Sequence, residues 1–327
     1  MKVLVVRFSS IGDIVLTTPV VRGLKKQLGA EVHYLTKANF QEVLAHNPHI
    51  DQIHLLSPTN WTAIVAQLKA EKFDYIIDLH HNVRTLKLKL ALGVKAYSFD
   101  KLNIQKWLLV NLKINRMPAL HIVDRYLACV KPLGVNKDQQ GLDYFIASND
   151  EVSLSSLPLA FQNGYIGLVI GAQHFTKRLP KEKLVALLEN LTQAVIILGG
   201  PTDTELAEEL CKLAPTRIYN ACGKYNLNQS ASLVKQAQKI ICNDTGLMHI
   251  AAAFQKEIHL LWGNTIPAFG MGPYASNNAY HYEVPDLNCR PCSKIGFQQC
   301  PKGHFNCMNQ QDIAKLIGQL NFVTSKN

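Results

Sequence analysis

The most informative stretch of the chain reads Lys239-Ile240-Ile241-Cys242-Asn243-Asp244-Thr245-Gly246-Leu247-Met248-His249-Ile250-Ala251-Ala252-Ala253. The apolar run before Asn243 predicts a buried strand, and the small residues after Asp244 predict a helix. The first N–H groups of a helix lack intrahelical partners, and the helix dipole adds positive potential there. Thr245, Gly246 and His249 are therefore candidate phosphate ligands. The alternative is that Asp244 simply caps the helix, which is a common role for Asp.

A second turn of the same kind lies near the N-terminus. The run Val3–Val6 is followed by Arg7-Phe8-Ser9-Ser10-Ile11-Gly12-Asp13 and then by an apolar periodic segment over Ile14–Leu28. This order predicts a strand, a tight turn and a helix. Gly12 lets the backbone approach a ligand closely, and Asp13 lies where the helix starts. The turn lacks the G-x-G-x-x-G spacing of dinucleotide folds, which argues against a nicotinamide cofactor.

Short apolar segments separated by helical patterns continue along the chain. The predicted strands are Lys2–Val6, Glu31–Leu35, Gln52–Leu55, Tyr75–Leu79, Tyr165–Val169, Ala194–Leu198, Arg217–Tyr219, Lys239–Cys242 and Ile258–Leu261. This alternation predicts an α/β protein with parallel sheets covered by helices. The pattern lapses between Asn136 and Asn163, so we place a boundary near Ser155, with domains over residues 1–155 and 156–327.

These two domains are expected to be Rossmann-like halves that face each other across a cleft. Ligands of such sheets bind at the carboxyl ends of the strands, which is where both turns lie. We therefore expect Asp13 on one wall of the cleft and Asp244 on the other.

Composition narrows the class of protein. The 327 residues are 47% hydrophobic, and 34 basic against 24 acidic residues give a net charge of +10, which favours anionic partners. No apolar run approaches the roughly 18 residues that a membrane-spanning helix needs. Without a recognisable signal peptide or span, the cytoplasm is the expected location. No nucleic-acid-binding module is visible, so nucleic acid is not an expected partner.

The positive charge is concentrated in one segment of the first half. Residues 84–116 hold eight basic residues and one acidic residue, Asp100, interleaved with apolar side chains such as Trp107. Such a surface suits anionic lipid at the cytoplasmic face of the inner membrane. The alternative is an ordinary solvated helix face with its apolar side turned inward.

A third loop with phosphate-binding character belongs to the second half. Thr176, Lys177 and Arg178 follow the predicted strand that ends at Val169, and Pro180 then precedes a helical segment. Two cations in a strand-to-helix loop suit phosphate, although a single Lys-Arg pair is often merely exposed. A fourth loop, Gly199–Glu205, is a candidate contact for a ribose or base.

Several motifs, in this order, resemble those of glycosyltransferase family 9, which includes the ADP-heptose:lipopolysaccharide heptosyltransferases. They are Arg7-Phe8-Ser9-Ser10-Ile11-Gly12-Asp13, Asp78-Leu79-His80 with Arg84-Thr85, Lys177 with Leu179-Pro180, Gly199-Gly200, and Asp244-Thr245-Gly246 with His249 and Ala251-Ala252. The resemblance covers nearly the whole chain. It implies a GT-B architecture, a donor nucleotide held mainly by the C-terminal domain and an acceptor held by the N-terminal domain. It also implies an inverting transfer without a catalytic metal or cofactor.

The resemblance assigns roles to individual residues. Asp13 is the candidate general base that removes the acceptor hydroxyl proton. The donor-binding candidates are Gly12, Thr176, Lys177, Asp244, Thr245, Gly246 and His249, and the acceptor-binding candidates are Ser9, Ser10 and Arg84. The implied donor is a nucleotide sugar such as ADP-heptose, and the implied acceptor is the lipopolysaccharide core.

One departure leaves the donor open. Some heptosyltransferases of the family carry a Glu near the nucleoside where this chain has Pro201 and Thr202, with acids only at Asp203 and Glu205. A transferase for another nucleotide sugar, a sugar-nucleotide epimerase and a non-catalytic nucleotide-sugar binding protein are the alternatives. An epimerase needs no acceptor, and a binding protein does not need Asp13.

Four of the eight cysteines cluster near the C-terminus. Cys289, Cys292, Cys300 and Cys307 are separated by two, seven and six residues, with His304 inside the cluster. The spacing suits a structural zinc ion. Free thiols in a reducing cytoplasm are the alternative, and disulfides are the least expected state.

Overall fold

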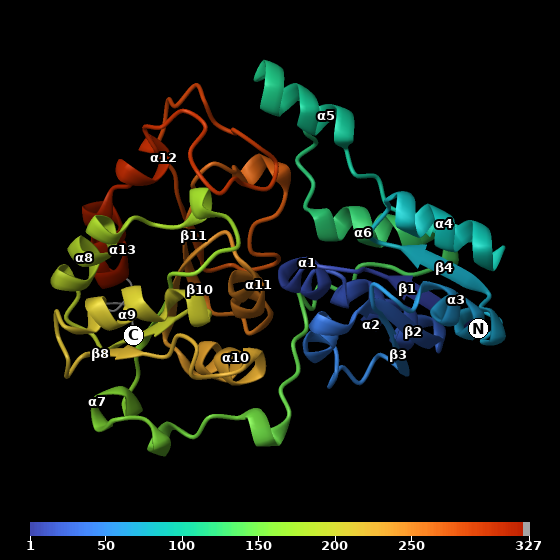
Figure 1. The fold of residues 1–327 in the computed structure, drawn as a ribbon, viewed down its shortest axis with the longest axis horizontal. Coiled ribbons are helices and arrows are strands. Elements are labelled where there is room, and N and C mark those ends of the chain that lie inside the picture. The colour runs from blue at the N-terminus through green and yellow to red at the C-terminus, as the bar shows by residue number, and fades with distance from the viewer. Residues whose placement is uncertain (323–327) are drawn as a thin grey trace. The chain divides into compact units, whose positions relative to one another are not determined.

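The computed structural model describes residues 1–322, which form two compact units (Figure 1). The first unit contains residues 1–102 and 119–147, and the second contains residues 103–118 together with the chain from residue 148 onward. Residues 103–118 belong to the second unit because Lys113 Nζ donates to the carbonyls of Cys289 (3.1 Å) and Pro291 (2.8 Å). Because the second unit resumes at Ser148, the expected boundary near Ser155 falls inside that unit.

The first unit is built on a five-stranded parallel sheet in the order β3-β2-β1-β4-β5. Its strands are β1 (Lys2–Val6), β2 (Glu31–Lys37), β3 (Gln52–Leu56), β4 (Tyr75–Asp78) and β5 (Ala96–Ser98). Its α-helices are α1 (Ile11–Val15), α2 (Thr18–Leu28), α3 (Trp61–Ala70), α4 (Val83–Leu92) and α6 (Ile122–Val130). Short 3-10 turns lie at Ala38–Val43 and Lys131–Leu133.

Burial on both faces explains why β1 is a continuous apolar run. Leu4 and Val6 pack with Ile64 and Leu68 of α3 and Leu88 of α4 in one hydrophobic cluster. Because successive strand residues point to opposite faces, the residues between them face the other side of the sheet. All residues from 3 to 6 are fully buried.

The second unit contains a six-stranded parallel sheet in the order β11-β10-β9-β6-β7-β8. Its strands are β6 (Ile166–Val169), β7 (Val195–Leu198), β8 (Ile218–Asn220), β9 (Lys239–Asn243), β10 (Glu257–Leu261) and β11 (Ala279–Tyr282). Its α-helices are α5 (Asn103–Trp107), α7 (Leu159–Gln162), α8 (Lys181–Asn190), α9 (Thr204–Cys211), α10 (Leu227–Gln236), α11 (Gly246–Ala253), α12 (Asn306–Asn309) and α13 (Ile313–Phe322). A π-helical turn lies at Leu108–Leu112, and 3-10 turns lie at Ser148–Asp150, Leu154–Ser156, Phe175–Lys177, Pro201–Asp203 and Pro267–Phe269. Apolar residues of α8, α9 and α13 form the main core with β6, β7 and β9.

The nine predicted strands are confirmed, with ends that shift by one or two residues. The sequence missed β5 and β11, two of the four edge strands, because each is short and only partly buried and so lacks an apolar run. It also predicted one helix over Ile14–Leu28, where the chain forms α1 and α2. Pro19 interrupts this segment because a proline cannot donate a backbone hydrogen bond and blocks the preceding turn.

Both sheets follow the strand order of a Rossmann fold, which is 3-2-1-4-5 within the first unit and 3-2-1-4-5-6 within the second. Within residues 1–322, no helix is both long enough and apolar enough to cross a membrane.

Candidate functional site

The candidate residues lie at equivalent places in the two sheets. In the first unit, the order of strands reverses between β1 and β4, and in the second unit it reverses between β6 and β9. Ligands of open α/β sheets bind beside this switch point, at the carboxyl ends of the strands. Asp13 follows β1 and Arg84 follows β4, while Lys177 follows β6 and Thr245 follows β9.

The carboxylate of Asp13 is held by a buried arginine. Arg7 Nη2 lies 2.7 Å from Asp13 Oδ2, and the same oxygen accepts a hydrogen bond of 2.9 Å from Ser10 Oγ. Ser10 N also points at this oxygen, at 3.3 Å. The carboxylate is thus fixed in direction, with its side chain about one-fifth exposed (22%).

Arg7 is itself fixed by three further contacts. Its Nε donates to the carbonyl of Ser9 (2.7 Å), and its Nη1 donates to the carbonyl of Leu79 (2.7 Å) and contacts Tyr126 Oη (3.1 Å). Burial opposes the charged guanidinium, but Asp13, Tyr126 and Tyr34 together raise the pKa of Arg7 above its usual value. The first switch point therefore holds a permanent positive charge behind Asp13.

This positive charge extends toward β4. Burial and the charge on Arg7 lower the pKa of His80 to about 4, so its imidazole is neutral at pH 7. The ring of Phe8 contacts His80 at 4.9 Å between centroids, and the Arg84 guanidinium lies 5.8 Å from the Phe8 ring. Arg84 is exposed at the start of α4. An exposed cation beside Phe8, which directly precedes Ser9, suits an anionic ligand.

Asp13 also takes part in a capping box. Its side chain returns to the backbone N–H of Ser10, the N-cap residue of α1. A capping role for Asp13 is therefore real, and any catalytic role would be additional.

In the second unit, an ion pair sits beside the N-terminus of α11. Lys177 Nζ lies 2.7 Å from Asp244 Oδ2, and Thr265 Oγ1 donates to the same carboxylate oxygen at 2.9 Å. Thr245, not Asp244, is the N-cap residue of α11, so capping is not the role of the Asp244 side chain. Instead, Asp244 and Thr265 fix the position of the Lys177 ammonium next to the helix start.

The loop that carries Lys177 is anchored by Thr176. The Thr176 hydroxyl donates to Asn264 Oδ1 (3.0 Å) and accepts from the backbone N–H of Phe297 (2.9 Å). Gly263 packs so closely against this loop that an added Cβ would collide with the Thr176 carbonyl. The Thr176 side chain is buried and its hydroxyl engaged, so it anchors the loop that carries Lys177, and its contact with a donor stays a prediction.

The other donor-binding candidates occupy helix starts. Gly246 is the first residue of α11, and His249 is buried in the same helix. Gly12 is buried in the first turn of α1, in the first unit. Their direct contact with a ligand remains a prediction.

The fourth loop, Gly199–Glu205, is held in place by hydrogen bonds to the carboxylate of Asp203. Asp203 accepts from the backbone N–H of Gly200 (2.9 Å) and from Arg178 Nη1 (3.0 Å), and it is buried. Its carboxylate is therefore committed to the loop, which leaves Glu205 as the exposed acid of this segment.

Two residues that hold the site carboxylates in place, Arg7 and Thr265, had no predicted role. Arg7 was visible as a charged residue directly after a buried strand, which is unusual enough to serve as a signal. Thr265 lies after β10, at the same edge of the sheet as the other loops, but a threonine in a loop carries no signal of its own.

The C-terminal cysteines lie in or next to an irregular segment. Within residues 1–322, which include all eight cysteines, none forms a disulfide. Burial raises the pKa of Cys307 to about 12, and burial and the neighbouring Cys289 raise the pKa of Cys292 to about 11. These thiols are protonated at pH 7, and their binding of zinc remains a prediction.

The sequence profile of glycosyltransferase family 9 (heptosyltransferase) matches residues 61–301 of this chain. Among known proteins, lipopolysaccharide heptosyltransferase 1 of Campylobacter coli is 23% identical over 350 residues, covering 98% of this chain and 99% of the relative.

Two solved structures have the same fold. One is Escherichia coli ADP-heptose LPS heptosyltransferase II, with a TM-score of 0.74, 20% identity and 98% coverage of both chains. The other is E. coli heptosyltransferase WaaC with ADP, with a TM-score of 0.69, 21% identity and coverage of 98% of this chain and 99% of that one. The expected GT-B class, with two Rossmann-like units, is confirmed.

Proposed function

Since the chain belongs to glycosyltransferase family 9, we propose that it transfers a heptose from ADP-heptose to a lipopolysaccharide core acceptor. The observation that carries this proposal beyond family membership is the Lys177 ammonium fixed beside the start of α11. A similar solved protein, the E. coli heptosyltransferase WaaC, is described with ADP, which makes ADP the first nucleotide to test.

In the proposed reaction, the donor diphosphate binds at the switch point of the second unit. The N-terminal N–H groups of α11, from Thr245 onward, and the Lys177 ammonium would neutralise the charge that develops on the leaving nucleoside diphosphate. His249 and Gly12 are proposed as further contacts to the donor. Asp244 competes with phosphate for Lys177, so we propose that it orients the ammonium before the donor binds.

Asp13 is the proposed general base. It would remove the proton of the acceptor hydroxyl while that oxygen forms the new bond to the sugar and the bond to the diphosphate breaks on the opposite face. This displacement inverts the anomeric configuration and requires no metal ion. The ion pair with Arg7 holds the Asp13 carboxylate in one direction before the acceptor binds.

The acceptor is proposed to bind at the first switch point. Ser9 and Ser10 precede Asp13 in the same turn, and Ser10 donates to its carboxylate. The exposed Arg84 lies against Phe8 of this turn. A guanidinium recognises phosphate or carboxylate groups well. The proposed contact is therefore with acidic groups of the lipopolysaccharide core.

A lipid-linked acceptor brings the enzyme to a membrane, and α4 offers a suitable surface for this contact. Val83, Leu86 and Leu90 are 71%, 51% and 75% exposed and lie at i, i+3 and i+7 of α4. The basic Arg84 and Lys87, both exposed, lie beside them, and α4 contains no acidic residue. We propose that this face contacts anionic lipid at the cytoplasmic side of the inner membrane.

The donor is tested by calorimetric titration of wild type and Lys177→Ala with ADP, UDP, GDP and CMP. We expect selective binding of ADP that weakens in the variant. Preference for another nucleotide would keep the mechanism and change the donor, and the commitment of Asp203 to its own loop makes this alternative worth testing. Absence of binding to every nucleotide would contradict the proposal.

The acceptor is tested by product analysis with ADP-heptose, with and without a lipopolysaccharide core. We expect a heptosylated core and ADP in equal amounts, only when both substrates are present. Release of an epimerised sugar without acceptor would support an epimerase instead.

Membrane contact is tested by sedimentation with vesicles of phosphatidylcholine alone or mixed with phosphatidylglycerol. We expect binding to the anionic vesicles that weakens in Leu86→Ser/Leu90→Ser. Leu159→Ser is the matched control, because Leu159 is 80% exposed on α7, away from this basic segment in sequence. Equal binding by both variants and wild type would contradict the assignment to α4.

A further inference from the structure

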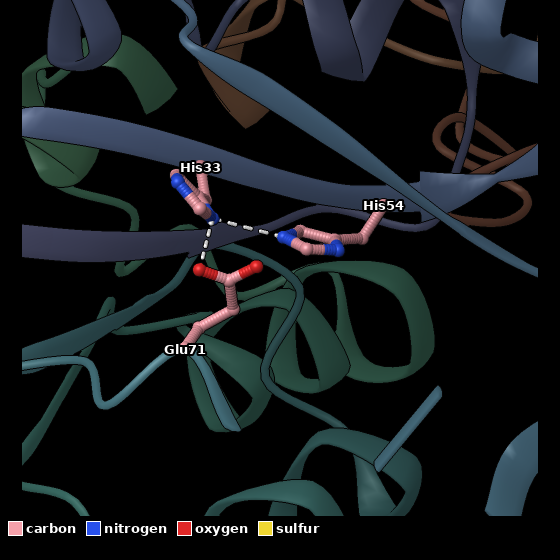
Figure 2. Close-up of side chains that lie close together, drawn as sticks. All are labelled: His33, His54 and Glu71. Atoms are coloured by element: carbon pink, nitrogen blue, oxygen red, sulfur yellow. Dashed lines mark hydrogen bonds and ion pairs between the residues drawn. The ribbon is translucent and has the colours of Figure 1, made fainter. Parts of the chain in front are cut away.

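One group of metal-ligating side chains lies in the first unit, apart from its switch point. Figure 2 shows His33 of β2, His54 of β3 and Glu71, the residue that ends α3. β2 and β3 are parallel, with Leu35 opposite His54, so the two histidines lie two positions apart on one face of the sheet. Among residues 1–322, these three residues are the group of His, Cys, Asp or Glu whose ligand atoms converge.

The distances are close to those that a metal ion needs. His33 Nδ1 lies 2.9 Å from His54 Nε2 and 3.9 Å from Glu71 Oε2, and the three ligand atoms lie within 4.8 Å of one another. Zinc bonds of about 2.0–2.1 Å place neighbouring ligand atoms of a tetrahedral site roughly 3.3 Å apart. Small side-chain adjustments would therefore bring all three atoms to bonding distance of one ion.

A second carboxylate orients the first ligand. His33 Nε2 lies 3.0 Å from Glu31 Oε1. A proton on Nε2 that is donated to this carboxylate leaves the lone pair of Nδ1 directed at His54 and Glu71. Metal-binding histidines are commonly oriented in this way, by a carboxylate on the other ring nitrogen.

The surroundings of the two imidazoles favour a site closed to bulk water. His33 and His54 are each 1% exposed, and the edge of the Phe73 ring packs against both. His54 Nδ1 has no hydrogen-bond partner among the described residues. Binding of an ion through Nε2 would therefore replace a single hydrogen bond, the one to His33.

The charge balance also favours a dication. Two carboxylates, Glu31 and Glu71, share one cation, because Lys2 Nζ lies 3.0 Å from the first and 2.9 Å from the second. With neutral imidazoles the group carries a net charge of −1. Lys2 competes for the same Glu71 oxygen, but its side chain is 25% exposed and can turn toward solvent.

We propose that His33, His54 and Glu71 form a structural site for a transition-metal dication, with Zn²⁺ as the preferred ion. Two imidazoles and one carboxylate suit Zn²⁺ rather than Mg²⁺ or Ca²⁺, which prefer oxygen ligands throughout. Lys2 and Glu31 begin β1 and β2, whereas Arg7 follows the other end of β1. The ion would therefore link β2, β3 and α3 near the amino ends of the strands, whereas Asp13 lies at their carboxyl ends. It would take no part in sugar transfer.

The test uses the full chain, purified with a chelator and titrated with Zn²⁺ by calorimetry, with thermal unfolding measured in parallel. We expect one equivalent to bind and to raise the melting temperature. Glu71→Gln should weaken binding at least about tenfold, since even the loss of an outer-shell partner costs about 10–100-fold. Lys2→Gln should strengthen binding, because it removes the competing ammonium from Glu71.

Co²⁺ distinguishes this site from the C-terminal cysteines. Binding at His33, His54 and Glu71 should give d–d absorption without a sulfur-to-cobalt charge-transfer band. A strong charge-transfer band at one equivalent, or zinc affinity unchanged in both Glu71→Gln and Lys2→Gln, would overturn the proposal. So would the absence of zinc binding by folded wild-type protein. Glu71 is partly exposed at a helix end, so circular dichroism should show that its variant folds.

Discussion

The two switch points have the same topology and each holds an ion pair, but the exposure of the two partners differs between them. In the first unit, Arg7 is the inner member of the ion pair (side chain 10% exposed) and Asp13 is the outer one (22%). In the second unit, Lys177 and Asp244 are exposed to similar extents, 15% and 12%. A fixed carboxylate suits proton removal, and an accessible ammonium beside a helix start suits phosphate.

A histidine beside each ion pair reports the same positive character. Burial, and then Arg7, lowers the pKa of His80, and burial, and then Lys177, lowers the pKa of His174. In both cases burial is the larger cause, and the neighbouring cation lowers the pKa further. Both switch points thus hold a cation, and only in the first is the carboxylate the more exposed member of the pair.

The largest expected effect is on Asp13. A general base contributes on the order of 100- to 10,000-fold, so Asp13→Asn should lower kcat by that factor. The affinity for nucleotide should not change, because Asp13 belongs to the first unit. Steady-state kinetics and calorimetry measure the two quantities.

Asparagine is the right replacement because it keeps the capping geometry with Ser10. Loss of the ion pair with the buried Arg7 should lower the melting temperature, so kcat is measured at a temperature at which circular dichroism shows the variant to be folded. Near-normal turnover in this variant would reduce Asp13 to a helix cap and leave the first switch point without a catalytic group.

Lys177→Ala should have the next largest effect. Loss of one preorganised charge stabiliser costs about 100- to 1,000-fold in turnover, and here nucleotide affinity should fall as well. Lys181→Ala is the matched control, since Lys181 pairs with Glu209 on the surface of α8 and α9. Unchanged nucleotide binding in Lys177→Ala would show that Lys177 does not bind phosphate. The proposed difference between a base in the first unit and a phosphate site in the second would then be wrong.

Most of the fold could be predicted because the deciding signals are local. Buried parallel strands such as β1 and β9 are continuous apolar runs, and each is followed by a recognisable turn. The edge strands β5 and β11 could not be predicted, because their short, half-buried sequences resemble loops. Residues 103–118 could not be assigned to the second unit, since Lys113 contacts carbonyls more than 170 residues away.

The candidate site was predictable only as far as the motifs extend. The turns around Asp13 and Asp244 have the composition of strand-to-helix loops, so their placement followed from sequence. The contacts of Asp244 with Lys177 and Thr265 join loops after three different strands, and no sequence spacing encodes them. The same holds for His33, His54 and Glu71, which only the strand register brings together.

Arg84→Ala should act on the acceptor alone. A charge-assisted hydrogen bond contributes about 1.5–3 kcal/mol, so the acceptor KM should rise about tenfold or more while donor KM stays constant. Lys87→Ala, a neighbour on α4 without a role at the switch point, is the control. An unchanged acceptor KM would remove Arg84 from the site.

The pH dependence of stability tests the positive character of the first switch point. Unfolded histidine has a pKa near 6.5, whereas the pKa of His80 is about 4 in the folded protein. The unfolded state therefore binds more protons as pH falls, and the stability present above pH 6.5 is lost progressively toward pH 4. Because His80 is partly exposed, we expect a loss of about 1–2 kcal/mol rather than the full shift at 1.36 kcal/mol per unit.

Chemical unfolding at several pH values measures this loss, and His80→Gln should flatten it. An equally steep dependence in the variant would assign the titration to other groups such as His54, whose pKa burial also lowers to about 4.

The smallest expected effects come from the hydroxyl groups that orient the two carboxylates. Ser10 donates to Asp13 and Thr265 donates to Asp244, at 2.9 Å in both cases. A typical hydrogen bond contributes about 1 kcal/mol, so Ser10→Ala and Thr265→Val should each change function only about fivefold. The quantity that changes should differ: kcat for Ser10→Ala, and nucleotide affinity for Thr265→Val. If both variants altered the same quantity, the two ion pairs would share one role, and the division between a base in one unit and a phosphate site in the other would be wrong.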